Sequence, residues 1–89
     1  MFRVRWKNTA LDQLADIWVQ GDPELRSAIT SAVQTIDKKL RIDPNEYGES
    51  REATDRVWFV FPLGIRFEVD DNELIVRILK TWSIRRKEK

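Results

Sequence analysis

The sequence of 89 residues contains no cysteine and no histidine. A secreted domain of this size would usually depend on disulfides, so the absence of cysteine predicts a cytoplasmic protein. The absence of histidine excludes a Ser-His-Asp triad, a histidine general base and a histidine-ligated metal. Proton transfer would fall to Asp, Glu, Tyr, Lys or Arg side chains. We therefore expect neither a metal nor a cofactor.

Glycine and proline are also scarce, with three residues of each. This composition does not indicate a disordered or fibrous chain. The longest apolar stretch, residues 57–65, is too short to cross a bilayer as a helix. The first residues alternate between charged and apolar, whereas a signal peptide would need an unbroken apolar stretch. We expect one domain over residues 1–89 and no membrane partner.

The charge that is present is unevenly distributed, although the net charge is only +1. Residues 1–7 carry +3 from Arg3, Arg5 and Lys7, and residues 8–50, with four basic and eight acidic side chains, carry −4. Residues 74–89, with six basic side chains and one acidic, carry +5. Basic ends permit a nucleic-acid partner, although the overall charge does not suggest one. We expect residues 85–89 to form a flexible basic tail.

The first half of the chain predicts one strand and two helices. Alternation of apolar and basic residues over 2–7 indicates the strand. Apolar residues at helical spacing predict a first helix that is capped by Thr9, buries Trp18 and ends near Gly21. Asp22 and the proline after it begin a second helix, which ends at residues 43–44. A tight turn makes these helices an antiparallel hairpin.

The second half predicts a loop and three strands. Residues 43–55 are polar and are expected to be a loop, followed by strands at 56–61 and 63–69. A hairpin turn at Asp71-Asn72 leads into a last strand of about ten residues that begins near Leu74. The predicted class is α+β with the order β-α-α-β-β-β. A mostly antiparallel four-stranded sheet carries the helical hairpin on one face.

Two of the predicted strands carry apolar residues on both faces. A sheet covered on one face should alternate between apolar and polar residues, but strand 56–61 and the last strand do not. We therefore expect an apolar patch on the face away from the helices, unless the stems of Arg66 and Arg77 shield it. The expected surface for a nucleic acid or a protein partner consists of Trp58, Ile75, Arg77, Leu79, Lys80, Trp82 and Arg86.

Four groups of short runs follow one another along the chain. They are Trp6 with Ala10-Leu11-Asp12 and Leu14-Ala15-Asp16-Ile17-Trp18; Ile36-Asp37, Leu40, Asp43-Pro44 and Gly48-Glu49-Ser50-Arg51; Pro62-Leu63-Gly64-Ile65-Arg66-Phe67-Glu68-Val69-Asp70; and Lys80-Thr81-Trp82. In this order and spacing they resemble the RelE/ParE superfamily of toxins from type II toxin–antitoxin systems, which includes plasmid stabilisation proteins. Together they cover nearly the whole chain, and no single run is specific.

The resemblance implies a toxin that is silenced by a cognate antitoxin. RelE-type members cut messenger RNA in the ribosome, and ParE-type members inhibit DNA gyrase. A homodimer or a heterotetramer with the antitoxin is then expected. Three functions stay open: a ribosome-dependent mRNA endoribonuclease, a gyrase inhibitor without enzymatic activity, and a degenerate toxin that only binds its antitoxin.

The sequence departs from the RelE-type pattern at two places. The arginine that usually lies three positions before the aromatic residue of the third strand is replaced by Gly64, counting from Phe67. The pair at the end of the last strand, often His-Tyr or Lys-Arg, is replaced by Trp82-Ser83. The remaining catalytic candidates are Arg66, Arg56, Arg51, Glu49 and Arg85. Their alternative roles are ion pairs, solvated strand or loop positions and, for Arg85, part of a soluble tail.

Overall fold

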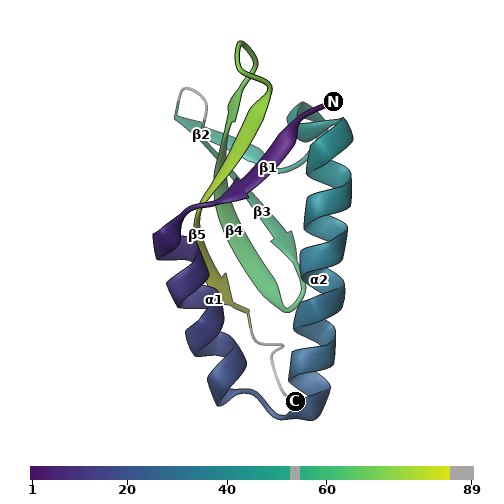
Figure 1. The fold of residues 1–89 in the computed structure, drawn as a ribbon, viewed down its shortest axis with the longest axis vertical. Coiled ribbons are helices and arrows are strands. Elements are labelled where there is room, and N and C mark those ends of the chain that lie inside the picture. The colour runs from purple at the N-terminus through teal and green to yellow at the C-terminus, as the bar shows by residue number, and fades with distance from the viewer. Residues whose placement is uncertain (53–54, 85–89) are drawn as a thin grey trace.

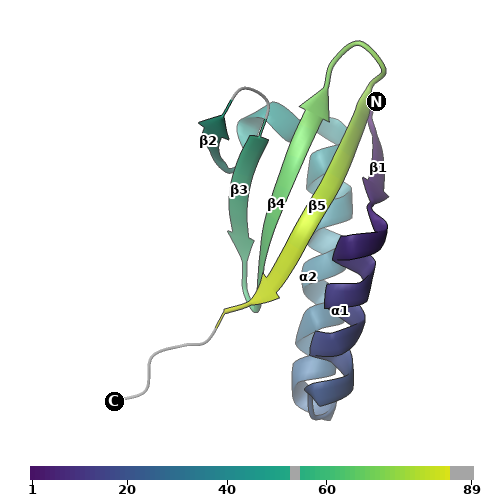
Figure 2. The ribbon, with the colours of Figure 1, turned by 90° about the vertical axis from the view of Figure 1, so that its left-hand side faces the viewer.

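A computed structural model describes residues 1–52 and 55–84, apart from the side chains of residues 50–52. Its elements are β1 (Arg3–Trp6), α1 (Asn8–Gln20), α2 (Pro23–Ile42), the 3-10 helix η1 (Pro44–Glu46), β2 (Glu49–Glu52), β3 (Asp55–Val60), β4 (Leu63–Asp70) and β5 (Ile75–Ser83). They form one sheet layer and one helical layer, with both helices on the same face of the sheet (Figures 1 and 2). The predicted α+β class is confirmed.

The sheet has the strand order β1-β5-β4-β3-β2. β1 runs parallel to β5, and the other neighbouring strands are antiparallel. The sheet therefore has five strands and not the four that were predicted, because β2 forms within the segment expected to be a loop. The polar composition of β2 explains the error, since this short edge strand has none of the apolar alternation by which a strand is recognised.

The second helix follows its sequence signals. The Asp22 carboxylate accepts a hydrogen bond from the N–H of Leu25 at 2.8 Å, and Pro23 occupies the first turn. The apolar stripe at helical spacing is buried against the sheet and consists of Ile29, Ala32, Ile36 and Leu40. The predicted start of this helix at Asp22 and the following proline is confirmed.

The first helix differs from its prediction at two residues. It begins at Asn8, with Lys7 at the N-cap position and no side-chain cap, so Thr9 is not the cap. Trp18 is 40% exposed and is not a core residue. The Arg26 guanidinium instead lies over the Trp18 ring, with Cζ 5.6 Å from the ring centroid. The Trp18 carbonyl accepts a hydrogen bond from Arg26 Nε at 2.8 Å. Trp18 therefore lies at the surface where the two helices join.

An irregularity in β5 determines which residues face the helices. Phe67 of β4 pairs with Ile78, whereas the preceding Arg66 pairs with Lys80, so Leu79 is an extra residue, a β-bulge. Beyond the bulge Thr81 is buried, and its backbone N–H donates to the Gln13 side chain of α1 at 2.9 Å. The bulge at Leu79 thus shifts the alternation of inward and outward side chains by one residue. This shift partly explains why the apolar residues of the last strand did not follow the predicted alternation.

Two residues expected in an apolar patch on the open sheet face do not contribute to one. Trp58 pairs in register with the buried Ile65, so it lies on the helix side, where its ring packs against Tyr47 at 4.7 Å. Ile75 does lie on the open side but is only 8% exposed, since it is paired between Arg3 of β1 and Asp70 of β4. Neither residue contributes to an exposed apolar patch. Leu79 is partly exposed.

The turn between β4 and β5 is longer than predicted. It occupies residues 71–74, and Leu74 adopts a left-handed conformation with φ of 57° instead of beginning the strand. The Asp70 carboxylate accepts hydrogen bonds from the N–H groups of Asn72 and Glu73 at 3.1 and 3.0 Å. Donation from Glu73 is the main cause that lowers the pKa of Asp70 below its ordinary value of 3.8, and Asn72 and Arg77 act in the same direction. Within the described residues no helix has the length and apolar character needed to cross a membrane.

We expect the Asp70 charge to make stability depend on acid pH. Because its folded pKa lies below 3.8, its contribution is present above that pH and is lost as the pH falls through the lowered value. Asp70→Asn should therefore lower the melting temperature at neutral pH and flatten its decline in acid. Thermal melts between about pH 2 and pH 7 would measure this. Glu73→Gln is the matched control, and an equal effect of both changes would contradict the assignment.

Candidate functional site

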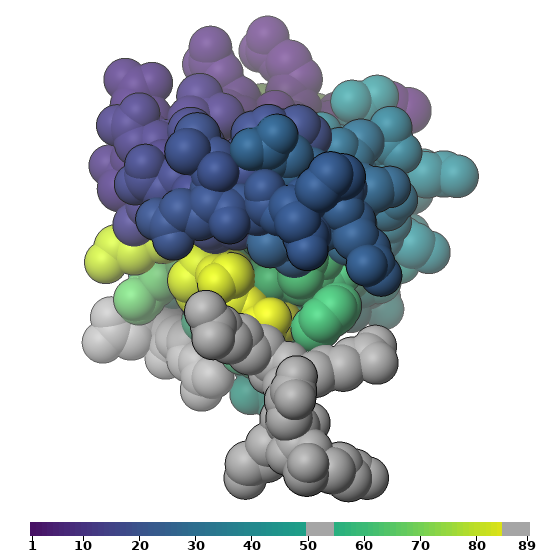
Figure 3. Space-filling model, turned by 90° about the horizontal axis from the view of Figure 1, so that it is seen from below, coloured from purple at the N-terminus to yellow at the C-terminus, as the bar shows by residue number. Residues whose placement is uncertain are grey.

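The face of the sheet away from the helices is the candidate site. In the described residues the helical layer covers only the other face, and Figure 3 shows the helices on one side of the molecule and the strand ends on the other. A single row crosses this open face in register, from Phe59 of β3 through Gly64 of β4 to Trp82 of β5. Phe59 is 55% exposed and Trp82 is 37% exposed. We call Phe59 and Trp82 the aromatic pair.

The aromatic pair depends on the glycine between its members. The rings of Phe59 and Trp82 meet edge to face, with centroids 6.3 Å apart. A Cβ atom on Gly64 would lie 2.5 Å from Cε2 and Nε1 of Trp82, so the indole occupies the space that a side chain at residue 64 would need. The two departures from the RelE-type pattern are therefore one arrangement, because an arginine at residue 64 could not coexist with Trp82 in this position.

The two arginines in the centre of the open face are paired with acids. Arg66 contacts the Asp55 carboxylate through Nε and Nη2 at 3.1 and 3.0 Å. Arg77 lies 3.3 Å from Glu68 and 3.6 Å from Asp70. Such paired cations have less charge to offer to a phosphate. Lys80, which lies opposite Arg66 in register, is exposed and forms no ion pair with a described residue.

Of the three catalytic candidates whose side chains are described, Glu49 and Arg66 lie in one register row of the open face, and Arg56 lies on the helix side. Arg56 is in register with the buried Phe67 and donates to the carbonyls of Tyr47 and Gly48 at 3.3 and 3.4 Å, so it braces the segment before β2. Arg66 points to the opposite face. Glu49 is exposed on β2 in register with Val57.

Three of the predicted residues cannot be placed. Arg51 belongs to β2 but its side chain lies outside the described part of the structure, as do Arg85 and Arg86. No group of Asp and Glu side chains within the described residues could hold a metal ion.

Two features of this face were missed from the sequence. Phe59 was not predicted to lie on this surface. Phe59 and Trp58 are adjacent and face opposite sides of the sheet, and only the register with β4 shows which of them faces outward. The basic residues of β1 were predicted to lie on a strand, but the place of that strand beside β5 was not predicted. The parallel register that sets Arg5 beside Arg77 was not visible, since it joins opposite ends of the chain.

Comparison with known proteins agrees with the architecture. No protein-family model matches the sequence, and no curated protein matches it. Solved structures do match over nearly the whole chain. A chain of the chromosomal ParDE system of P. aeruginosa is 22% identical, with a TM-score of 0.74 and coverage of 96% of this chain and 98% of that one.

The chain has the fold of the RelE and ParE toxins. A chain of the RelBE2 toxin–antitoxin complex of Mycobacterium tuberculosis is 21% identical, with a TM-score of 0.72 and coverage of 92% and 96%. The isolated RelE toxin of E. coli is 11% identical, with a TM-score of 0.64 and coverage of 99% and 89%. Identities this low establish a shared RelE/ParE fold and leave the activity to be argued from the site.

We expect Gly64 and Trp82 to be coupled in stability. Gly64→Ala should cost about 1–3 kcal/mol, because the added methyl group must displace the indole. The same change should be nearly neutral in a Trp82→Ala background, where the space is free. Urea unfolding of the two single variants and the double variant gives the coupling energy. Additive effects would show that the indole does not occupy this space in solution.

Proposed function

We propose that this chain is the toxin of a type II toxin–antitoxin pair and that it acts by binding a protein target, as ParE-type gyrase inhibitors do. The RelE/ParE fold supports the toxin role, and the arrangement of Gly64 and Trp82 on the open face carries the choice of mechanism. The site of action would be the cytoplasm.

RNA cleavage needs several converging groups, and two features of the described part of this face oppose it. A 2′-hydroxyl can attack its own phosphate only if one group takes its proton and others stabilise the charge of the pentavalent phosphorus. Here an indole fills the space at residue 64, and Asp55 neutralises Arg66. An aromatic surface flanked by ion pairs and by Lys80 suits contact with another protein, because exposed Trp side chains supply much of the energy of such interfaces.

The cognate antitoxin is the second proposed partner. Phe59 and Trp82 offer an apolar contact to an amphipathic helix or strand laid across the sheet. A single face would then serve both the target and the antitoxin, so that occupation by the antitoxin silences the toxin. A homodimer and a heterotetramer with the antitoxin both remain predictions.

We expect production of the chain without an antitoxin to arrest growth. Purified protein at micromolar concentration should inhibit supercoiling by DNA gyrase and leave messenger RNA intact in a translation extract. Cleaved messenger RNA with unaffected supercoiling would instead identify an endoribonuclease. Normal growth with neither effect would reject toxicity and favour a degenerate toxin that only binds its antitoxin.

The aromatic pair should carry the inhibition. Phe59→Ser should weaken it at least tenfold, since loss of a central aromatic contact typically costs about 2 kcal/mol or more. Val19→Ser removes a side chain that is 69% exposed on α1, in the helical layer, and serves as the matched control. Equal inhibition by the two variants would show that the open face is not the binding surface.

A further inference from the structure

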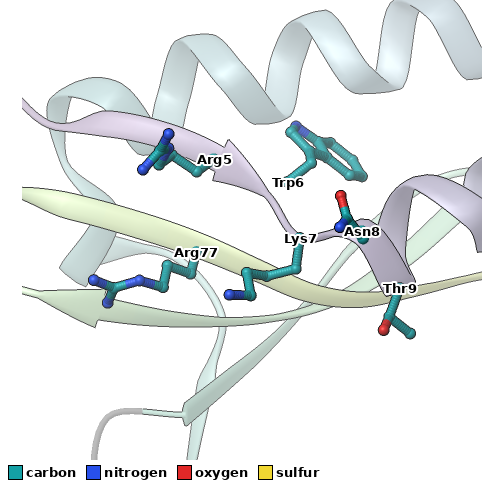
Figure 4. Close-up of a pocket in the computed structure, with 6 residues that line it drawn as sticks. All are labelled: Arg5, Trp6, Lys7, Asn8, Thr9 and Arg77. Carbon is teal, nitrogen blue, oxygen red and sulfur yellow. The ribbon is translucent and has the colours of Figure 1, made fainter.

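A polar hollow lies at the junction of β1 and α1, and the proposed protein contacts do not use it. Its volume is about 390 Å³. Figure 4 shows its lining, which consists of Arg5, Trp6, Lys7, Asn8, Thr9 and Arg77. Three of these six residues are basic and none is acidic. The parallel register of β1 and β5 sets Arg5 directly beside Arg77, so segments from opposite ends of the chain build this hollow.

The cations of the hollow are less neutralised than those in the centre of the sheet. Arg77 is held by Glu68 and Asp70, but Arg5 and Lys7 are exposed and form no ion pair with any described residue. The hollow therefore offers two uncompensated positive charges, whereas Arg66 is matched by Asp55. An anionic ligand would gain more from these two charges than from Lys80, the single cation beside the aromatic pair that is unpaired within the described residues.

The backbone around the hollow is fixed in place. The N–H of Lys7 donates to the carbonyl of Ile78 at 2.9 Å, which ties the strand–helix junction to β5. The Trp6 indole N–H donates to Asp37 of α2 at 3.1 Å, and Figure 4 shows Trp6 turned towards that helix and away from Lys7. The basic side chains thus project from a rigid frame, which lowers the entropic cost of binding.

The first turn of α1 adds donors to the same place. No side chain caps this helix, and its first turn contains no acidic residue. Its free N–H groups and partial positive charge favour an anion there. The amide of Asn8 and the hydroxyl of Thr9 supply further hydrogen-bond donors.

We propose that this hollow binds the phosphate backbone of a nucleic acid. A phosphate group accepts several hydrogen bonds at once, and the arginine fork, the lysine ammonium, the hydroxyl and the amide match that need. An alternative role for basic residues on an edge strand is to prevent that strand from pairing with another chain. That role would require the charges of β1 alone and would not require a hollow shared with Arg77 and an uncapped helix.

Binding of a fluorescent 20-base-pair DNA duplex to the full chain, followed by anisotropy over a series of salt concentrations, tests the proposal. Arg5→Gln/Lys7→Gln should weaken binding at least tenfold at low salt. It should also make the slope of log K against log salt shallower by about 2, because about one unit is lost for each phosphate contact removed. Lys7→Gln alone should reduce the slope by about 1.

The matched control removes the same charge from another surface. Lys38→Gln/Lys39→Gln lies on α2 and should change affinity by less than about twofold, with the slope unchanged. Thermal melts establish that each variant is folded. Unlabelled duplex should compete for the hollow, whereas a polyglutamate peptide of equal charge should compete at least tenfold less well.

Three results would overturn the proposal. Equal weakening by the two double variants would mean that only net charge matters. Equal competition by polyglutamate would assign the hollow to an acidic protein segment. Unchanged DNA binding together with self-association of Arg5→Gln/Lys7→Gln would mean that the charges only protect the edge of β1. Neither gyrase nor an antitoxin is present in the assay, so its outcome is independent of the proposed inhibition.

Discussion

The extra residue in β5 is the constraint on which the candidate site depends. With strict alternation from the buried Ile78, Lys80 and Trp82 would face the helices and Thr81 would face outward. The bulge at Leu79 reverses this order, and Gln13 and the Gly64 carbonyl hold Thr81 on the inner side at 2.9 Å each. A contact from α1 thus decides that the end of β5 presents an indole and an ammonium group to partners.

The helices were predictable because their signals are local. The apolar stripe of α2, Asp22 and Pro23 all act within a few residues of the chain. The faces of the strands were not predictable to the same degree. Trp58 and Phe59 are neighbours of similar character, and their roles are assigned by pairing with Ile65 and Gly64. Pairing is a long-range property, and a shift of one residue exchanges the two faces.

Other errors arise from competing local effects. Leu74 looked like the start of a strand because it continues an apolar alternation, but the turn closed by Asp70 requires a residue with positive φ at that place. Ile75 is apolar on the open face, yet flanking strands on both sides cover it. Periodicity therefore placed Ile75 on the correct face without measuring how much of it is exposed.

The absence of an arginine at residue 64 has two interpretations. It is either the loss of a catalytic group or the formation of an aromatic binding surface. A simple loss would leave empty space beside residue 64. It would not explain why the paired residue of the neighbouring strand is as large as tryptophan. Instead the missing Cβ is matched by an indole that needs its space, and Phe59 packs against the edge of that indole. Both substitutions serve one aromatic surface. Among the described residues, Lys80 beside it is unpaired, while Arg5 and Lys7 place two uncompensated charges at the β1 edge. A large apolar contact with a single unpaired cation beside it suits the proposed binding to a protein, whereas a phosphoryl-transfer site would need several charged groups at the reacting phosphate.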